Sequence, residues 1–397
     1  MPARARPPVA KLHAPRGAWW NDRTIRAILY QVFTLAAVIA VGWYLVHNTL
    51  ANLAARNIAT GLGFLTREAG FEISEGPISY GAADNYLRAF AVGLLNTLIV
   101  SGIGVVLATI IGTIIGVARL SSNWLVARLA SIYVEAMRNV PLILQLLFWY
   151  GLLIAMPGNR EALQPISGVF LSNRGMYYPT IEPHPVHLVM EVLFVLGIGL
   201  AVAAYMWGQK RQRRTGQPFP LVWPTLACTL VPPLLAFLMA GAPLHLETPA
   251  MAGFNFQGGA VVSPEFTALV VGLVTYTAAF IAENVRAGIL AVPHGQTEAA
   301  RAIGLPPGLI LRLVILPQAL RVIVPPVTSQ YLNLTKNSSL AVAIGYPDLV
   351  SVANTSINQT GQAIEGIGII MAVYLTISLS ISGLMNWYNK RIALVER

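Results

Sequence analysis

The sequence predicts an all-α polytopic membrane protein with about eight transmembrane helices. Hydrophobic residues make up 55% of its 397 residues and charged residues only 11%, whereas soluble globular proteins contain about 25% charged residues. The mean hydropathy is +0.63. So few charges cannot cover the surface of a soluble protein of this length, which excludes an ordinary cytoplasmic enzyme, a disordered chain and a fibrous protein.

Apolar runs of about 20 residues, the length that a helix needs to cross a bilayer, define the predicted spans. The eight candidates are residues 25–46, 90–118, 140–156, 187–207, 221–241, 266–291, 320–345 and 366–387. The first is not expected to be a cleaved signal peptide, because its apolar part is too long and no small-residue cleavage site follows. The seventh contains two prolines and a lysine, so we expect it to face other helices or water, and a break in it is compatible with this composition.

Lysine and arginine residues lie mainly in alternate connections between the predicted spans. If the N-terminus is cytoplasmic, 20 of the 26 fall inside, 5 fall outside, and Lys336 lies within a span. An excess of these residues marks the cytoplasmic side of a membrane protein, so both termini are expected there. The net charge of +10 does not indicate nucleic-acid binding, because the basic residues lie between apolar runs.

Cysteine and histidine give no sign of a metal site. Cys228 is the only cysteine, which excludes an internal disulfide and a cysteine metal site. His184 and His187 are three residues apart, but the prolines beside them predict an extended loop. We therefore predict no metal, since zinc needs at least three protein ligands.

The connection 293–317 carries the start and stop signals of a helix of its own. Thr297 is expected to cap this helix, and Glu298 then lies in the first turn, where a carboxylate is favourable. Gly304 and the Pro306-Pro307 pair end it. These signals predict a helix of about two turns on the cytoplasmic side, docked on a partner because so short a helix is unstable alone.

The stretch GQTEAARAIG at 295–304, followed by VILPQAL at 314–320, resembles the EAA loop of ABC importer permeases. In that family the loop docks into a groove on the cytoplasmic ATPase, and small alanine side chains suit a close approach. The alternative is an amphipathic connector whose alanines only favour a helix. The resemblance implies that the residues coupling the chain to an ATPase are Glu298, Ala299, Ala300, Gly304, Leu316 and Pro317.

Three further stretches resemble permeases that import polar amino acids, of the histidine and glutamine type: RNVPLILQ at 138–145, YTAAFIAENVRAG at 276–288 and NLTKNSSLAVAIG at 333–345. The resemblance implies a type I ABC importer permease core of five helices, here enlarged by an N-terminal helix and a two-helix insertion. That enlarged form is similar to a permease subunit of the general L-amino acid importer of Gram-negative bacteria. The expected organisation is a cytoplasmic tail (1–24), an extra transmembrane helix (25–46), a periplasmic loop (47–89), the first core part (90–157), the insertion (158–264), the second core part (265–390) with the coupling loop (293–317), and a cytoplasmic tail (391–397).

The resemblance also implies the partners. A periplasmic binding protein would deliver L-amino acids, a second homologous permease would complete the pore, and an ATPase dimer would bind ATP and Mg. The chain itself has no G-x-x-x-x-G-K-[ST] sequence, so we expect it to bind no cofactor and to catalyse no reaction. The expected location is the bacterial inner membrane.

Polar residues within the spans are candidates for a substrate pathway: Thr275, Tyr276, Glu283, Tyr331, Asn333, Lys336, Ser338 and Ser339. Intramembrane charges are usually functional. For Glu283 and Lys336 we nevertheless favour contacts that hold helices together, such as a Glu283–Arg286 pair, because selectivity can reside in the binding protein. An ion-coupled secondary amino acid transporter, an intramembrane enzyme and an ABC permease for another small solute remain as alternatives.

Overall fold

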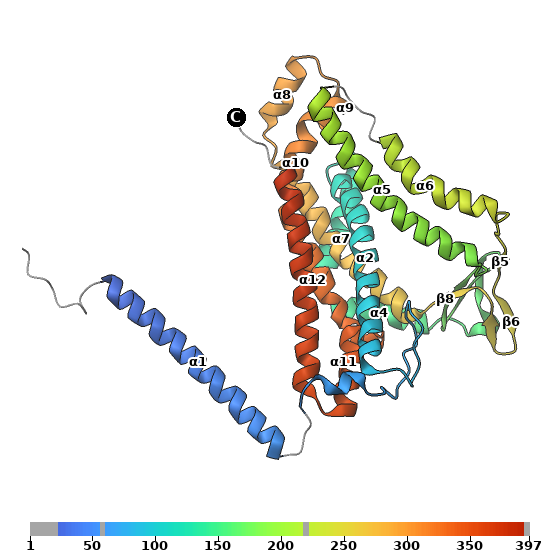
Figure 1. The fold of residues 1–397 in the computed structure, drawn as a ribbon. Coiled ribbons are helices and arrows are strands. Elements are labelled where there is room, and N and C mark those ends of the chain that lie inside the picture. Colours follow the sequence, from blue (N-terminus) through green and yellow to red (C-terminus); the bar gives the residue numbers. More distant parts are fainter. Residues whose placement is uncertain (1–22, 56–59, 217–221, 393–397) are drawn as a thin grey trace, which may run out of the picture.

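The computed structural model describes residues 23–55, 60–216 and 222–392, so most of both predicted tails lies outside the described residues. The described chain is mostly helical (Figure 1). The helices are α1 (Arg23–Ala55), α2 (Tyr86–Ala118), α3 (Trp124–Asn139), α4 (Leu142–Ile154), α5 (Pro185–Thr215), α6 (Val222–Met239), α7 (Pro264–Leu290), α8 (His294–Ala302), α9 (Pro307–Ile310), α10 (Leu316–Asn337), α11 (Leu349–Thr360) and α12 (Ala363–Ile392). Short 3-10 helices lie at Leu62–Thr66, Asn159–Glu161 and Ser338–Ile344, and a π-helix at Leu311–Ile315.

The prediction of a polytopic helical protein is confirmed. Seven helices of the described part are long and apolar enough to cross a membrane. The remaining candidate, residues 140–156, corresponds to α4, which has only 13 residues. At about 1.5 Å per residue, α4 is shorter than the hydrocarbon core of a bilayer. The number eight is reached only if α3 and α4, which meet at 105°, count as one bent span.

Pro141 explains the bend between α3 and α4. Proline disfavours helical backbone at the residue before it, and Val140 is indeed extended, with φ −99° and ψ 126°. The bend frees backbone carbonyls that a straight helix would use. The Gln145 side-chain amide donates to two of them, Met137 O at 2.9 Å and Val140 O at 3.0 Å. The Gln145 side chain therefore braces the corner within the RNVPLILQ stretch.

Helix α7 is the centre of the core, and α2, α3, α4 and α10 all pack along it. The approach of α2 to α7 depends on glycines. A Cβ at Gly112 would lie 2.8 Å from Ala278 O, and one at Gly116 would lie 2.7 Å from Ala282 O. These two glycines therefore let α2 and α7 approach closely.

The polar seventh span changes form after Asn337, and its composition is compatible with such a break. Helix α10 ends at Asn337 and continues as a 3-10 helix over Ser338–Ile344, which Gly345 ends in a left-handed conformation. Helix α11 follows, and its 12 residues are too few to span a bilayer. Thus the region after α10 folds back onto the core at one end of the bundle, where Leu349 and Val352 are buried beside Phe90.

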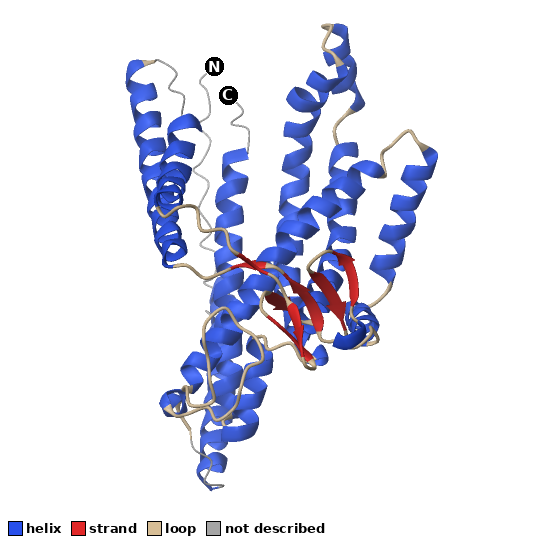
Figure 2. Cartoon of the chain, turned by 90° about the vertical axis from the view of Figure 1, so that its right-hand side faces the viewer, coloured by secondary structure: helices blue, strands red, loops and turns tan. Residues whose placement is uncertain are grey.

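The insertion 158–264 contains short strands that the sequence analysis did not predict, gathered in one region (Figure 2). They are β1 (Leu163–Ile166), β2 (Val169–Ser172), β3 (Gly175–Tyr178), β4 (Thr180–Ile181), β5 (Leu246–Glu247), β6 (Ala250–Ala252), β7 (Asn255–Gln257) and β8 (Ala260–Val262). An antiparallel sheet has the order β1-β2-β3-β8, and Tyr177 pairs with Phe170 and Val261. Because β3 precedes and β8 follows the α5–α6 hairpin, the sheet joins both ends of the insertion.

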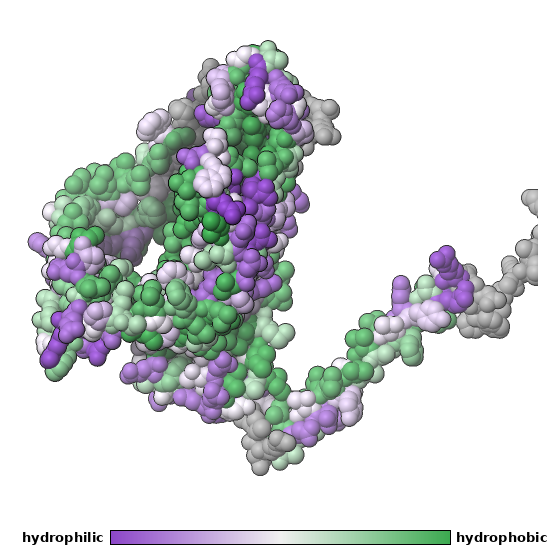
Figure 3. All heavy atoms as spheres, turned by 180° about the vertical axis from the view of Figure 1, so that it is seen from behind, coloured by the Kyte–Doolittle hydropathy of each residue, from purple (hydrophilic) through white to green (hydrophobic). Residues whose placement is uncertain are grey.

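Two parts of the fold expose apolar surface on nearly every side. Helix α1 has no buried residue and lies apart from the helical body in Figure 1. The α5–α6 hairpin packs mainly on itself and arches away from that body, and green apolar side chains cover it in Figure 3. Helices that are apolar all round belong in lipid or against another membrane helix.

Candidate functional site

Helix α8 presents the EAA-like stretch at one end of the molecule (Figure 1). Glu298 and Ala299 are exposed, whereas Ala300 is only 4% exposed. The helix has nine residues, in agreement with the predicted two turns. Its two adjacent alanines thus differ: one fills space inside the chain, and the other is available to a partner.

The stop signals of α8 act as predicted, but the start signal does not. Gly304 has φ +80°, a left-handed conformation that favours glycine, and its N–H bonds to Arg301 O. Thr297 is not the N-cap, because α8 begins one turn earlier at His294, after Pro293. Glu298 therefore lies in the second turn, where its carboxylate contacts His294 Nδ1 at 3.0 Å.

The segment after α8 connects it to the membrane core. Helix α9 starts at Pro307, the π-helix Leu311–Ile315 follows, and α10 begins at Leu316. Pro317 occupies the first turn of α10, where a missing N–H costs nothing. Leu316 also lines a cavity in the core. The last two predicted coupling residues thus begin the helix that carries the candidates Tyr331, Asn333 and Lys336.

Helix α10 has two different long faces. One is exposed and contains Val322, Pro325, Pro326, Ser329, Asn333 and Lys336. Their spacings of three and four residues place them along one side of a helix. Lys336 forms no ion pair with any residue in the described part of the chain. The candidates Asn333 and Lys336 therefore share an open, partly polar surface.

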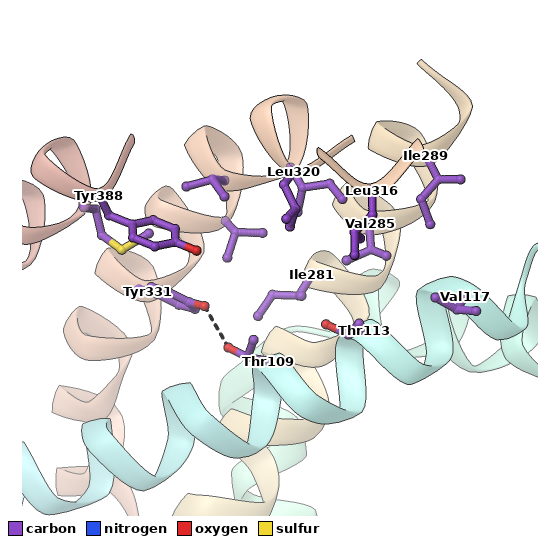
Figure 4. A pocket seen from close by; sticks show the side chains of 14 residues that line it. Thr109, Thr113, Val117, Ile281, Val285, Ile289, Leu316, Leu320, Tyr331 and Tyr388 are labelled. Atoms are coloured by element: carbon purple, nitrogen blue, oxygen red, sulfur yellow. Dashed lines mark hydrogen bonds between the residues drawn. The ribbon is translucent and has the colours of Figure 1, made fainter. Parts of the chain in front are cut away.

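The opposite face of α10 lines an apolar cavity of about 440 Å³. Its walls come from α2, α7, α10 and α12, and Figure 4 shows Tyr331 and Thr109 pointing toward each other across it. Their hydroxyl oxygens are 2.9 Å apart. Tyr331 thus lies behind the exposed face of α10 and not on it. Thr109 was not among the sequence candidates, and its position in a glycine-rich apolar run gave no signal.

The other candidates are engaged in local contacts. The Thr275 hydroxyl donates to Val271 O at 2.7 Å, and the Tyr276 ring packs against Phe280 with centroids 4.9 Å apart. Ser338 is fully buried and donates to Thr335 O at 2.8 Å, while Ser339 donates to Lys336 O at 2.7 Å. The structure does not bring all eight candidates into one cluster.

Glu283 lies in an ion network between three helices. Arg286, on the same helix, places Nη2 at 2.5 Å from Glu283 Oε1, which is the expected intrahelical pair. Arg119, at the end of α2, pairs with the other carboxylate oxygen and also reaches Ser131 Oγ on α3 at 3.4 Å. Arg119 is 164 residues away in sequence, so no local pattern could have indicated this contact.

Replacing Glu283 with glutamine is expected to lower the free energy of unfolding by about 1–2 kcal/mol. The substitution leaves two arginines facing each other, and the Arg119 side chain is only 13% exposed. The measurement is thermal unfolding of the purified complex in detergent. Glu135→Gln is the matched control, because Glu135 is exposed on α3 and forms no ion pair in the described residues. A Glu283→Gln variant that melts like the control but loses uptake would contradict the packing role and favour a pathway role.

Asp348 is a fully buried carboxylate. It caps α11, accepting from Ser351 N at 2.8 Å. Burial raises the pKa of Asp348 to about 6. An aspartate directly before an apolar helical run is an N-cap signal that could have located α11.

No three His, Cys, Asp or Glu side chains in the described ranges form a metal-binding group.

Comparisons with known proteins agree with these features. Residues 104–394 match the family described as the binding-protein-dependent transport system inner membrane component. The chain is 52% identical over 377 residues to the putative amino-acid ABC transporter permease protein YhdX of Escherichia coli strain K12, covering 94% of this chain and 96% of that protein. It is 48% identical over 388 residues to the general L-amino acid transport system permease protein AapQ of Rhizobium johnstonii (96% and 97%). It is 43% identical over 409 residues to the glutamate/glutamine/aspartate/asparagine transport system permease protein BztB of Rhodobacter capsulatus (95% and 96%).

Proposed function

This chain belongs to the family of inner membrane components of binding-protein-dependent transport systems, and we propose from this that it takes up L-amino acids delivered by a periplasmic binding protein. It is the multi-pass permease subunit of an ABC importer. The assignment of the substrate class rests on one observation. The chain is similar to three amino-acid permeases over at least 94% of its length, which includes the insertion. The breadth of the substrate range is part of the proposal.

We propose that α8 is the docking element for a separate ATPase dimer, which binds ATP and Mg. Exposed Glu298 and Ala299 would contact that partner, and buried Ala300 with left-handed Gly304 would fix the shape of the loop. Leu316 and Pro317 would transmit the movement to α10. A helix of nine residues that exposes small side chains needs such a partner for a stable position.

The exposed face of α10 is the proposed wall of the translocation pathway. A lysine in a spanning segment is costly in lipid, so this face would meet water or a second permease. A homologous second permease would supply the opposite wall. In this arrangement Lys336 would attract the α-carboxylate of a passing amino acid, and Asn333 would donate or accept a hydrogen bond.

Both termini are proposed to be cytoplasmic. In Figure 1 the coupling helix α8, the C-terminal end of α5 and the C-terminal end of α12 lie at the same end of the molecule. Those ends carry basic residues, including Lys210 and Lys390. The positive-inside rule therefore favours this end as the cytoplasmic one.

The experiment that tests the function is purification of the tagged chain from native membranes in mild detergent, followed by reconstitution. We expect an ATPase and a second permease to co-purify. Uptake of labelled L-amino acids into liposomes should require ATP and the binding protein, and should resist an uncoupler. Uptake by the chain alone that an uncoupler abolishes would favour an ion-coupled secondary transporter. Uptake of only another solute class would contradict the amino-acid assignment.

A further inference from the structure

The α5–α6 hairpin packs little on the core of its own chain, so other molecules must cover most of its surface. Gly197 lets the two helices approach closely, since a Cβ there would lie 2.5 Å from Cys228 O. Their outward sides expose large apolar residues, such as Val202 at 52% and Met206 at 62%. An exposed apolar surface of this extent on a membrane protein is covered by lipid or by another membrane helix.

The end of α5 concentrates positive charge. Lys210, Arg211, Arg213 and Arg214 are consecutive but for one glutamine, whereas no Asp or Glu occurs between Glu191 and Glu247. The hairpin therefore contains no carboxylate near its basic end. This end of the hairpin is therefore strongly basic, and it attracts anions.

The basic side chains are arranged around a pocket on one face of the helix. A pocket of about 380 Å³ is lined by Trp207, Lys210, Arg211, Arg214 and Thr215. The Arg211 guanidinium lies 5.8 Å from the centre of the Trp207 ring. Positions 207, 210, 211 and 214 fall on the same side of an α-helix. Toward the middle of the helix, the same side continues as exposed apolar surface at Leu200 and Leu196.

We propose that this pocket binds the phosphate headgroup of an anionic phospholipid, with the acyl chains lying along the apolar surface of the hairpin. Cations, an indole at the level of the headgroups and a continuous apolar surface together match an amphipathic anion. An acidic protein surface would satisfy the cations but would leave the apolar surface beneath them uncovered. The assignment to the cytoplasmic leaflet rests on the orientation proposed above, whereas the binding of the lipid does not.

The lipid site gives the insertion a function. The sheet holds both ends of the insertion together at one side of the membrane, and the bound headgroups would hold the opposite end of the hairpin. The hairpin would then keep a fixed depth and tilt although it packs little on the core. It would serve as a lipid-bound arm beside the permease core.

The test uses the assembled complex in mild detergent and titrates it with phosphatidylglycerol or phosphatidylcholine under native mass spectrometry. The variant is K210Q/R211Q, which leaves Arg213 and Arg214 to preserve topology. The matched control is K390Q/R391Q at the end of α12. It removes the same Lys-Arg pair, also one turn after a tryptophan, because Arg391 lies over the Trp387 ring at 4.1 Å.

K210Q/R211Q is expected to bind phosphatidylglycerol about thirtyfold more weakly than the wild type, and phosphatidylcholine unchanged. The control should differ from the wild type by less than about threefold, and the charge-preserving K210R/R211K should retain binding. The proposal is overturned if K210Q/R211Q binds like the wild type, or if the control weakens equally. It is also overturned if the variant keeps the lipid but loses the ATPase on purification, since a protein surface would then be the occupant. Because lipid binding needs no transport, failure here leaves the proposed function intact.

Discussion

Replacing Ala299 with arginine is expected to reduce ATP-driven uptake at least about hundredfold, while the isolated permease melts like the wild type. Ala299 is exposed on α8, so the fold has room for a long side chain there. A docked ATPase would not have that room. A hundredfold loss corresponds to about 2.8 kcal/mol, which lies in the range for burying an unpaired charge at an interface.

The neighbouring alanine provides the contrast. Ala300 is 4% exposed and packs inside the loop, so Ala300→Arg should destabilise the permease itself. Ala136→Arg is the control for a new exposed arginine, because Ala136 is exposed on α3. The measurements are thermal unfolding, retention of the ATPase on purification, and uptake in liposomes. If Ala299→Arg keeps its ATPase and its uptake, the assignment of α8 as the coupling helix is wrong.

Local sequence signals predicted that a short helix, α8, is present and where it ends. Gly304 and the prolines after it need only their own backbone conformations, and these do not depend on distant contacts. The error at Thr297 is also local in origin. Threonine is a good N-cap, but Pro293 takes that position. Its ring fixes φ, here −58°, its ψ of 134° is not helical, and the helix starts directly after it.

Features set by contacts between distant residues could not be predicted from one sequence. The Arg119–Glu283 pair joins two helices, and the β3–β8 pairing joins the two ends of an insertion. Strands of three or four residues carry too little alternation to be recognised.

The structure of the polar seventh span could be predicted only in part. Its composition predicted that it could not face lipid all round, and a helix with exposed Lys336 and Asn333 agrees with that expectation. Composition could not show which of its residues lie on which face of the helix. The structure places Tyr331 at the apolar cavity and Lys336 on the opposite, exposed face, and it separates both from Glu283. Only Lys336 of the two intramembrane charges lacks an ion pair within the described chain.

Replacing Lys336 with methionine is therefore expected to reduce uptake about hundredfold without weakening the complex. Methionine has a similar length and a lower cost in a membrane, so the thermal unfolding temperature should stay the same or rise. Lys336→Arg retains the charge and should retain part of the uptake. Lys390→Met, at the cytoplasmic end of α12, is the matched control and should transport like the wild type.

The direction of the stability change separates the two interpretations of Lys336. If its ammonium pairs with a carboxylate of the second permease, its removal leaves an unpaired buried charge and the complex should melt at a lower temperature or dissociate. If it faces the pathway, only the attraction for the substrate carboxylate is lost. ATPase activity stimulated by the binding protein should then persist while uptake falls, because α8 is unchanged. Loss of stability together with uptake would reject a pathway role for Lys336.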